Sequence, residues 1–120
     1  MDENVQEKIN QMQILQQNME NLSAQRQQFQ MQETELETAL SEIDKTEKTY
    51  KIIGSIMVLT DKSVLKNDLE ERKQMLAIRI SSIEKQESKL REKAEDIQKE
   101  VLAELEKKNA AKEQHTKSKK

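Results

Sequence analysis

Apolar side chains recur in the first fifty residues with the spacing of a coiled coil. One line of large apolar residues repeats every seven positions up to Tyr50. A companion line, three or four residues away, starts apolar and is then interrupted by Arg26, Glu33 and Glu47. This alternating spacing predicts a left-handed coiled-coil helix over residues 1–49. The charged interruptions predict a modest interface that separates easily.

The second half of the chain repeats this pattern. It predicts a helix over residues 61–106, which Asp61 or Ser63 can cap by accepting the free amides of the first turn. One line of its seam is unbroken and contains Leu69, Leu76, Ile83, Leu90 and Ile97. From Lys107 the pattern fades into a stretch with six lysines and one glutamate, which predicts a flexible basic tail over residues 107–120.

Each helix is expected to be about 45 residues and roughly 65–70 Å long. Because the connection between them is short, they must fold back antiparallel. With Tyr50 placed near Leu65, Val5 is expected to face residue 110 and Met12 to face Ala103. The fold class is therefore mainly α: a long antiparallel two-helix coiled coil with a single β-hairpin at the helix–helix connection.

That hairpin is predicted from the sequence YKIIGSIMVLT, residues 50–60. Gly54-Ser55 between two apolar runs indicates a two-residue type II′ turn, in which glycine adopts the positive φ. The turn pairs Ile53 with Ile56 and, further along, Lys51 with Val58. We predict that this segment is an oligomerisation element, made by Tyr50, Ile52, Ile53, Gly54, Ile56, Met57, Val58 and Leu59.

Both faces of this hairpin are apolar, and Lys51 is the one charged residue on them. A solvated strand would alternate, so both faces need cover. A lone two-stranded ribbon is marginally stable and has two unpaired edges. The hairpin therefore predicts partners, joined edge to edge and packed face to face. There are two alternatives to a hairpin that binds partners. The segment could be an apolar loop folded over the end of the coil, or a loop that dips into a membrane.

Composition agrees with helices rather than a globular core. Charged residues make up 37% and aromatic residues 2% of the 120 residues, with no proline and one glycine. Cysteine is absent, His115 is the one histidine, and the net charge is −2. We therefore expect no enzyme activity, no metal, no cofactor and no nucleic acid or membrane partner. No signal peptide is visible, and the apolar run of residues 56–59 cannot span a bilayer, so a cytoplasmic protein is expected.

The stretch TYKIIGSIMVLTDKSVLKNDLEERKQML resembles the centre of archaeal prefoldin beta subunits and of their eukaryotic subunit-six relatives. There too a Tyr-Lys pair and a hairpin glycine precede an apolar strand and a leucine-rich helix start. The flanking helices are also similar, over roughly residues 3–106, although any coiled coil could imitate them. Alpha-class subunits carry two hairpins, whereas this chain has room for one.

The resemblance implies a hexamer of two alpha and four beta subunits, whose hairpins form a double β-barrel platform. It also implies an ATP-independent holdase that binds unfolded proteins at the free ends of its coils and delivers them to a group II chaperonin. The candidate client-binding residues near the chain ends are Val5, Ile9, Met12, Val101, Leu102 and Leu105.

From the residues alone, these end positions could equally staple the coil together. Ile9, Leu102 and Leu105 lie off the heptad seam, as expected of side chains that face a client. A structural coiled-coil adaptor, which docks one folded partner through its hairpin, is the alternative function. Binding of nucleic acid by the basic tail is a third hypothesis, and a disordered tail that aids solubility is the simpler explanation.

Overall fold

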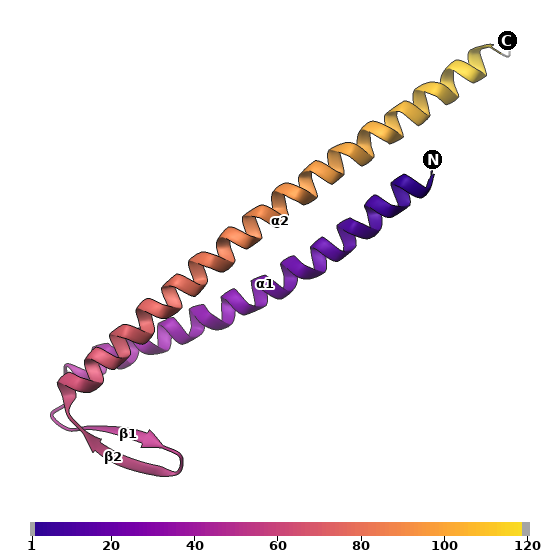
Figure 1. The fold of residues 1–120 in the computed structure, drawn as a ribbon. Coiled ribbons are helices and arrows are strands. Elements are labelled where there is room, and N and C mark those ends of the chain that lie inside the picture. The colour runs from indigo at the N-terminus through magenta and orange to yellow at the C-terminus, as the bar shows by residue number, and fades with distance from the viewer. Residues whose placement is uncertain (1, 119–120) are drawn as a thin grey trace. The chain divides into compact units, whose positions relative to one another are not determined.

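The fold of the chain is a helix, a β-hairpin and a second helix, in that order. The computed structural model describes the backbone of residues 2–118 and the side chains of residues 3–109. Its elements are α1 (Asp2–Ile43), β1 (Thr49–Ile53), β2 (Ile56–Thr60) and α2 (Lys62–Ser118), as Figure 1 shows. β1 and β2 form a two-stranded antiparallel sheet. The fold class predicted from the sequence is confirmed.

The chain divides into two compact units, and each contains a piece of both helices. The end unit combines residues 1–23 with residues 85–120. The hairpin unit comprises residues 24–84 and therefore holds the hairpin with the adjoining parts of α1 and α2. Each unit is built by an antiparallel pairing of helix segments.

Seam residues form the core of the hairpin unit. The most deeply buried apolar side chains, each 7–8% exposed, are Ile43, Leu76, Ile80 and Ile83. All four occupy positions on the predicted heptad lines. The guanidinium of Arg79 lies 5.9 Å from the centre of the Phe29 ring, close enough for a cation–π contact between α2 and α1. The heptad pattern thus identified the packed face of these helices.

The register between the helices differs from the one we expected. Lys73 of α2 pairs with Glu37 of α1, at 3.4 Å from Nζ to Oε1. In the end unit Lys8 pairs with Glu104, whereas the expected register placed residue 107 opposite it. The difference arises because α1 ends at Ile43 and the loop of residues 44–48 leads into β1. The expected partner of Val5, residue 110, has a side chain outside the described residues.

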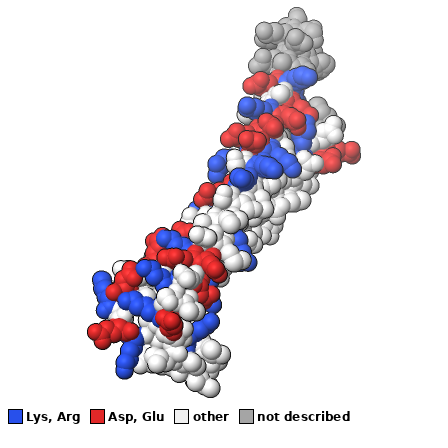
Figure 2. All heavy atoms as spheres, turned by 60° about the vertical axis from the view of Figure 1, so that its left-hand side comes forward, with Lys and Arg blue, Asp and Glu red and all other residues white. Residues whose placement is uncertain are grey.

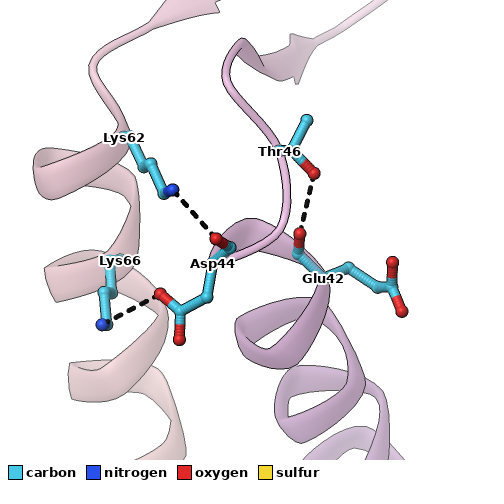
Figure 3. Close-up of polar contacts among 5 residues, drawn as sticks. All are labelled: Glu42, Asp44, Thr46, Lys62 and Lys66. Carbon is cyan, nitrogen blue, oxygen red and sulfur yellow. Dashed lines mark hydrogen bonds and ion pairs between the residues drawn. The ribbon is translucent and has the colours of Figure 1, made fainter.

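α1 ends at Ile43, earlier than the pattern suggested, and its last turn is closed by hydrogen bonds. The amide of Lys45 donates to the Glu42 carbonyl and the amide of Thr46 to the Ile43 carbonyl, both at 3.1 Å. The Thr46 hydroxyl also donates to the Glu42 carbonyl at 2.7 Å (Figure 3). These bonds satisfy carbonyls that the end of a helix leaves unpaired.

α2 begins with Asp61 as its N-cap. The amide of Ser63 donates to Oδ1 of Asp61 at 3.1 Å, and the Leu65 amide donates to the Asp61 carbonyl at 3.0 Å. Of the two caps that the sequence allowed, Asp61 is therefore the one used. Asp44, the residue after α1, accepts hydrogen bonds from two lysines of α2. Its carbonyl accepts from the Lys62 ammonium and its carboxylate from the Lys66 ammonium (Figure 3). These contacts join the helices where the chain enters and leaves the hairpin.

α2 continues as a helix past Lys107, where the seam pattern fades, through Ser118. The side chains beyond Asn109 and the whole of residues 119–120 lie outside the described residues. His115 is among them. The flexible basic tail over residues 107–120 stays a prediction, as do the domain boundaries drawn from the sequence.

Candidate functional site

The hairpin has the strand register that the sequence predicted. Ile53 pairs with Ile56, Ile52 with Met57, Lys51 with Val58 and Tyr50 with Leu59, and the ladder ends at the pair Thr49 and Thr60. Gly54 has a φ of 62°, and no other described residue has a positive φ. In a type II′ turn the first of the two central residues has a positive φ and the second does not. This explains why the only glycine of the chain stands here.

Seven large apolar side chains of the hairpin are exposed to solvent. Their exposed fractions run from 42% to 70%, and the residues are Tyr50, Ile52, Ile53, Ile56, Met57, Val58 and Leu59. They cover both faces, because side chains alternate along each strand. Exposed apolar groups gathered in one place mark a surface that binds another molecule. The hairpin is therefore the strongest candidate interaction surface among the described residues.

The open end of the hairpin is more buried than its tip. Thr49 is 7% exposed, and its hydroxyl donates to the Thr60 carbonyl at 2.7 Å. Thr49 and Thr60 are the pair nearest the two helices. This bond joins β1 to β2 at the end of the hairpin nearest the helices, and the apolar side chains nearer the turn stay exposed.

The six candidate client-binding residues fall into two groups in the end unit. Val5, Met12 and Val101 are half-buried, in line with their seam positions. The three off-seam residues are exposed, with fractions of 37% for Ile9, 51% for Leu102 and 41% for Leu105. The heptad pattern thus distinguished the packed from the free side chains. Their role in client binding stays a prediction.

A lysine between two glutamates joins the helices in the end unit. Nζ of Lys8 lies 2.8 Å from Oε1 of Glu104 and 3.6 Å from Oε2 of Glu100. The hydrogen bond to Glu104, with the charges of both carboxylates, raises the pKa of the Lys8 ammonium above its usual 10.5. Since Ile9 and Leu105 directly follow the paired residues Lys8 and Glu104, this contact brings the segments that carry them together. Sequence reasoning missed the pair, because finding it requires the register of the helices.

Other exposed apolar residues were also not predicted as functional. Ile14 lies on α1, and Val64, Met75 and Ile78 lie on α2, with exposed fractions of 56–70%. The signal that would have found them is simple: each is apolar and off both heptad lines. Met31 of α1, which is also off both heptad lines, is 66% exposed.

Within the part of the chain that the structure describes, no cluster of acidic or histidine side chains could hold a metal ion. In the same part, neither helix contains a stretch long and apolar enough to cross a membrane. Figure 2 shows basic and acidic side chains intermingled on the face it presents, rather than a patch of one sign.

Known proteins are similar to this chain in sequence. A family described as "Prefoldin subunit" matches residues 6–108. The chain belongs to the prefoldin family. The prefoldin beta subunit of Thermococcus onnurineus is 34% identical over 84% of this chain and 90% of its own length. That of Thermoplasma volcanium is 37% identical over 78% of this chain and 79% of its own.

A solved prefoldin structure has the same fold. The crystal structure of the prefoldin beta subunit from Thermococcus strain KS-1 superposes with a TM-score of 0.81 at 30% identity. The match covers 85% of this chain and 92% of that one. The resemblance to prefoldin beta subunits, inferred from the central stretch of the sequence, is confirmed. Membership in this family implies assembly with other prefoldin subunits.

Proposed function

We propose that this chain is a subunit of an ATP-independent holdase, which assembles through its hairpin and binds unfolded proteins at the free ends of its coils. The assembly is a hexamer with two alpha-class and four beta-class subunits. It works in the cytoplasm and passes its clients to a group II chaperonin. Holding a client requires no bond chemistry, so the chain needs neither catalytic residues nor a cofactor.

The exposed hairpin is the observation that carries this proposal. Full burial of an apolar side chain contributes about 1.5–3 kcal/mol, and seven such side chains stand exposed here. Even partial burial in an assembly would supply on the order of 10 kcal/mol before the cost of association. The free strand edges also offer unpaired backbone groups to a neighbouring strand.

The exposed apolar residues of the end unit support the proposed binding of unfolded proteins. Ile9, Leu102 and Leu105 present apolar side chains among charged ones. Such a surface suits weak contacts with varied apolar segments, since each contact contributes little by itself. Half-buried Met12 adds an unbranched, polarizable side chain that adapts to different neighbours.

The aggregation of a denatured protein tests the proposal. We expect this chain, assembled with an alpha-class partner, to suppress aggregation of a denatured test protein in the absence of nucleotide. Removal of residues 1–12 and 101–120 should abolish that protection while the hexamer survives in native mass spectrometry. A trimmed hexamer that protects as well as the intact one would contradict client binding at the ends.

The same experiment separates a holdase from a structural adaptor. An adaptor would bind one folded protein through the hairpin and would leave the denatured protein to aggregate. It would also have no use for exposed apolar side chains in the end unit. Failure to suppress aggregation by an intact hexamer would therefore favour the adaptor.

A further inference from the structure

A groove lies between α1 and α2 in the hairpin unit. Its volume is about 500 Å³, and its lining comes from residues 32–39 of α1 and residues 72–79 of α2. In each segment the lining residues are the first, fourth, fifth and eighth, which share one face of a helix. The groove is therefore formed by two matching helix faces, each about two turns long.

The interior of the groove is apolar. Leu76 is buried, Leu36 and Ala39 are half-buried, and Met75 is 56% exposed. Met75 is off both heptad lines, so the packing of α1 on α2 does not depend on its side chain. An unbranched, polarizable side chain in the lining of an apolar groove can adapt to the surface of a partner.

Two arginines give the α2 side of the groove a positive charge. Arg72 and Arg79 both line it, are exposed and stand seven residues apart, about 10 Å along the helix axis. Arg72 lies 3.4 Å from Asp68, in a pair near the surface of the kind that contributes little. Arg79 lies over the Phe29 ring at 5.9 Å, and a guanidinium in such a contact keeps N–H donors for a carboxylate. Both arginines can therefore bind a further carboxylate.

The α1 side of the groove has a different charge. Its polar lining residues are Gln32 and Glu35. Acidic groups of a bound segment would be repelled by Glu35 and attracted to the arginines across the groove. The charges therefore specify which side of a bound segment faces α2.

We propose that this groove binds an amphipathic helix of a protein outside the prefoldin assembly, which places two acidic residues, seven positions apart, on Arg72 and Arg79. The occupant follows from shape and charge. An apolar groove between two helix faces can receive the apolar face of a third helix, and carboxylates complement arginines. Arginines at a fixed spacing favour a partner of defined geometry over the varied segments of an unfolded protein.

This inference goes beyond the proposed function, since it requires neither assembly through the hairpin nor clients at the helix ends. Binding of a synthetic helix to the hexamer tests it. The probe is a fluorescent, monomeric helical peptide with leucines at its a and d positions and two glutamates seven residues apart. The control peptide has glutamine in place of both glutamates. Fluorescence anisotropy measures both dissociation constants with this chain assembled with an alpha-class subunit. We expect the probe to bind at least about fivefold more tightly, because only the probe can pair with both arginines.

The arginines and Met75 each have a matched control variant. Arg72→Gln combined with Arg79→Gln should bring the two peptides within about twofold of each other. Arg91→Gln, at an exposed position outside the groove, should preserve their difference. Met75→Glu places a carboxylate between the arginines and should weaken probe binding at least about tenfold, whereas Met75→Leu should leave it within about twofold. All of these substitutions introduce helix-forming residues, so circular dichroism should show unchanged helix content.

Equal affinity of the two peptides for the wild-type hexamer would overturn the proposal. Displacement of the probe by a denatured client would also overturn it, since the occupant would then be the client. Binding to the free chain but not to the hexamer would do the same, because a neighbouring subunit would then cover the groove. Val58→Asp separates this inference from the proposed function. Val58 does not line the groove, so a variant that no longer assembles should still bind the probe.

Discussion

The hairpin and the helix ends both expose apolar side chains, but they do so in different chemical settings. The hairpin gathers seven of them in ten strand residues, on two faces and beside unpaired strand edges. The end unit exposes Ile9, Leu102 and Leu105 on helices whose backbone bonds are already made. Charged residues such as Lys8 and Glu104 stand directly beside them.

This difference separates two kinds of binding. A surface with apolar faces and free backbone groups favours one fixed partner geometry, because strand pairing specifies register as well as affinity. Isolated apolar side chains on a finished helix specify no geometry, so they suit partners that vary. We infer that the hairpin is built for assembly and the helix ends for transient contacts. Four predictions test this division, in order of expected effect.

Placing a charge on the hairpin should have the largest effect. Val58→Asp introduces a carboxylate where an apolar face is expected to be covered, and a buried unpaired charge is very costly. We expect the dissociation constant of the hexamer to rise by roughly 100-fold or more. Native mass spectrometry should then show monomers or dimers. Ser41→Asp, which adds the same charge at an exposed position of α1, should leave the hexamer intact.

Removing the apolar side chains of the end unit should affect clients and not assembly. The triple variant Ile9→Gln, Leu102→Gln and Leu105→Gln keeps helix-forming residues at each position. We expect protection of a denatured protein to fall about fivefold to tenfold, since the apolar contacts are lost. Ile78→Gln is the matched control, because Ile78 is 70% exposed but belongs to the hairpin unit. Equal losses in the control and the triple variant would remove the distinction between the two regions.

Loss of the cap on α2 should weaken the junction that carries the hairpin. Asp61→Ala removes the carboxylate that accepts the Ser63 amide. We expect the free energy of unfolding to fall by about 1 kcal/mol, the usual effect of losing an N-cap. Ser63→Ala should have a smaller effect, because the Ser63 hydroxyl only adds a bond to the same carboxylate. Thermal unfolding monitored by circular dichroism measures both, and the opposite order would refute the cap assignment.

Breaking the ion pair of the end unit should have the smallest effect. Lys8→Gln removes a half-buried ammonium held by Glu104 and Glu100, and ion pairs near a protein surface contribute little. We expect the melting temperature to fall by at most a few degrees.

This small effect should depend on pH in one direction. Because the pKa of Lys8 is raised in the folded protein, its stabilisation is fully present below pH 10.5 and is lost as the pH rises through the raised value. The difference between wild type and Lys8→Gln should therefore be present below pH 10.5 and shrink as the pH rises beyond it. Lys45→Gln, which removes an ammonium 4.0 Å from Glu42, is the control for the loss of a surface charge. A difference that grew with pH would contradict the geometry of the Lys8 pair.

Local sequence patterns predicted most of the fold. The spacing of Leu76, Ile80 and Ile83 identified the buried face of α2, and Gly54 with its neighbours identified the turn and the strand register. Both patterns are short-range, since each repeats within a few residues. The helix–helix register was wrong by about one turn, because it depends on where α1 ends and how the loop of residues 44–48 leads into β1. Those details rest on hydrogen bonds around Glu42, Ile43 and Thr46 that no repeat encodes.

The sequence by itself determined the two amphipathic helices, the hairpin and its two apolar faces, because apolar periodicity and one glycine specify them locally. Only the tertiary structure decided which parts of the chain meet. Lys8 pairs with Glu104, Asp44 pairs with Lys66, and β1 rather than β2 lies beside the two helices. The physical reason is that such contacts depend on the register and direction of elements far apart in the sequence. A shift of one helical turn changes every one of these pairs and leaves the apolar pattern of each helix intact.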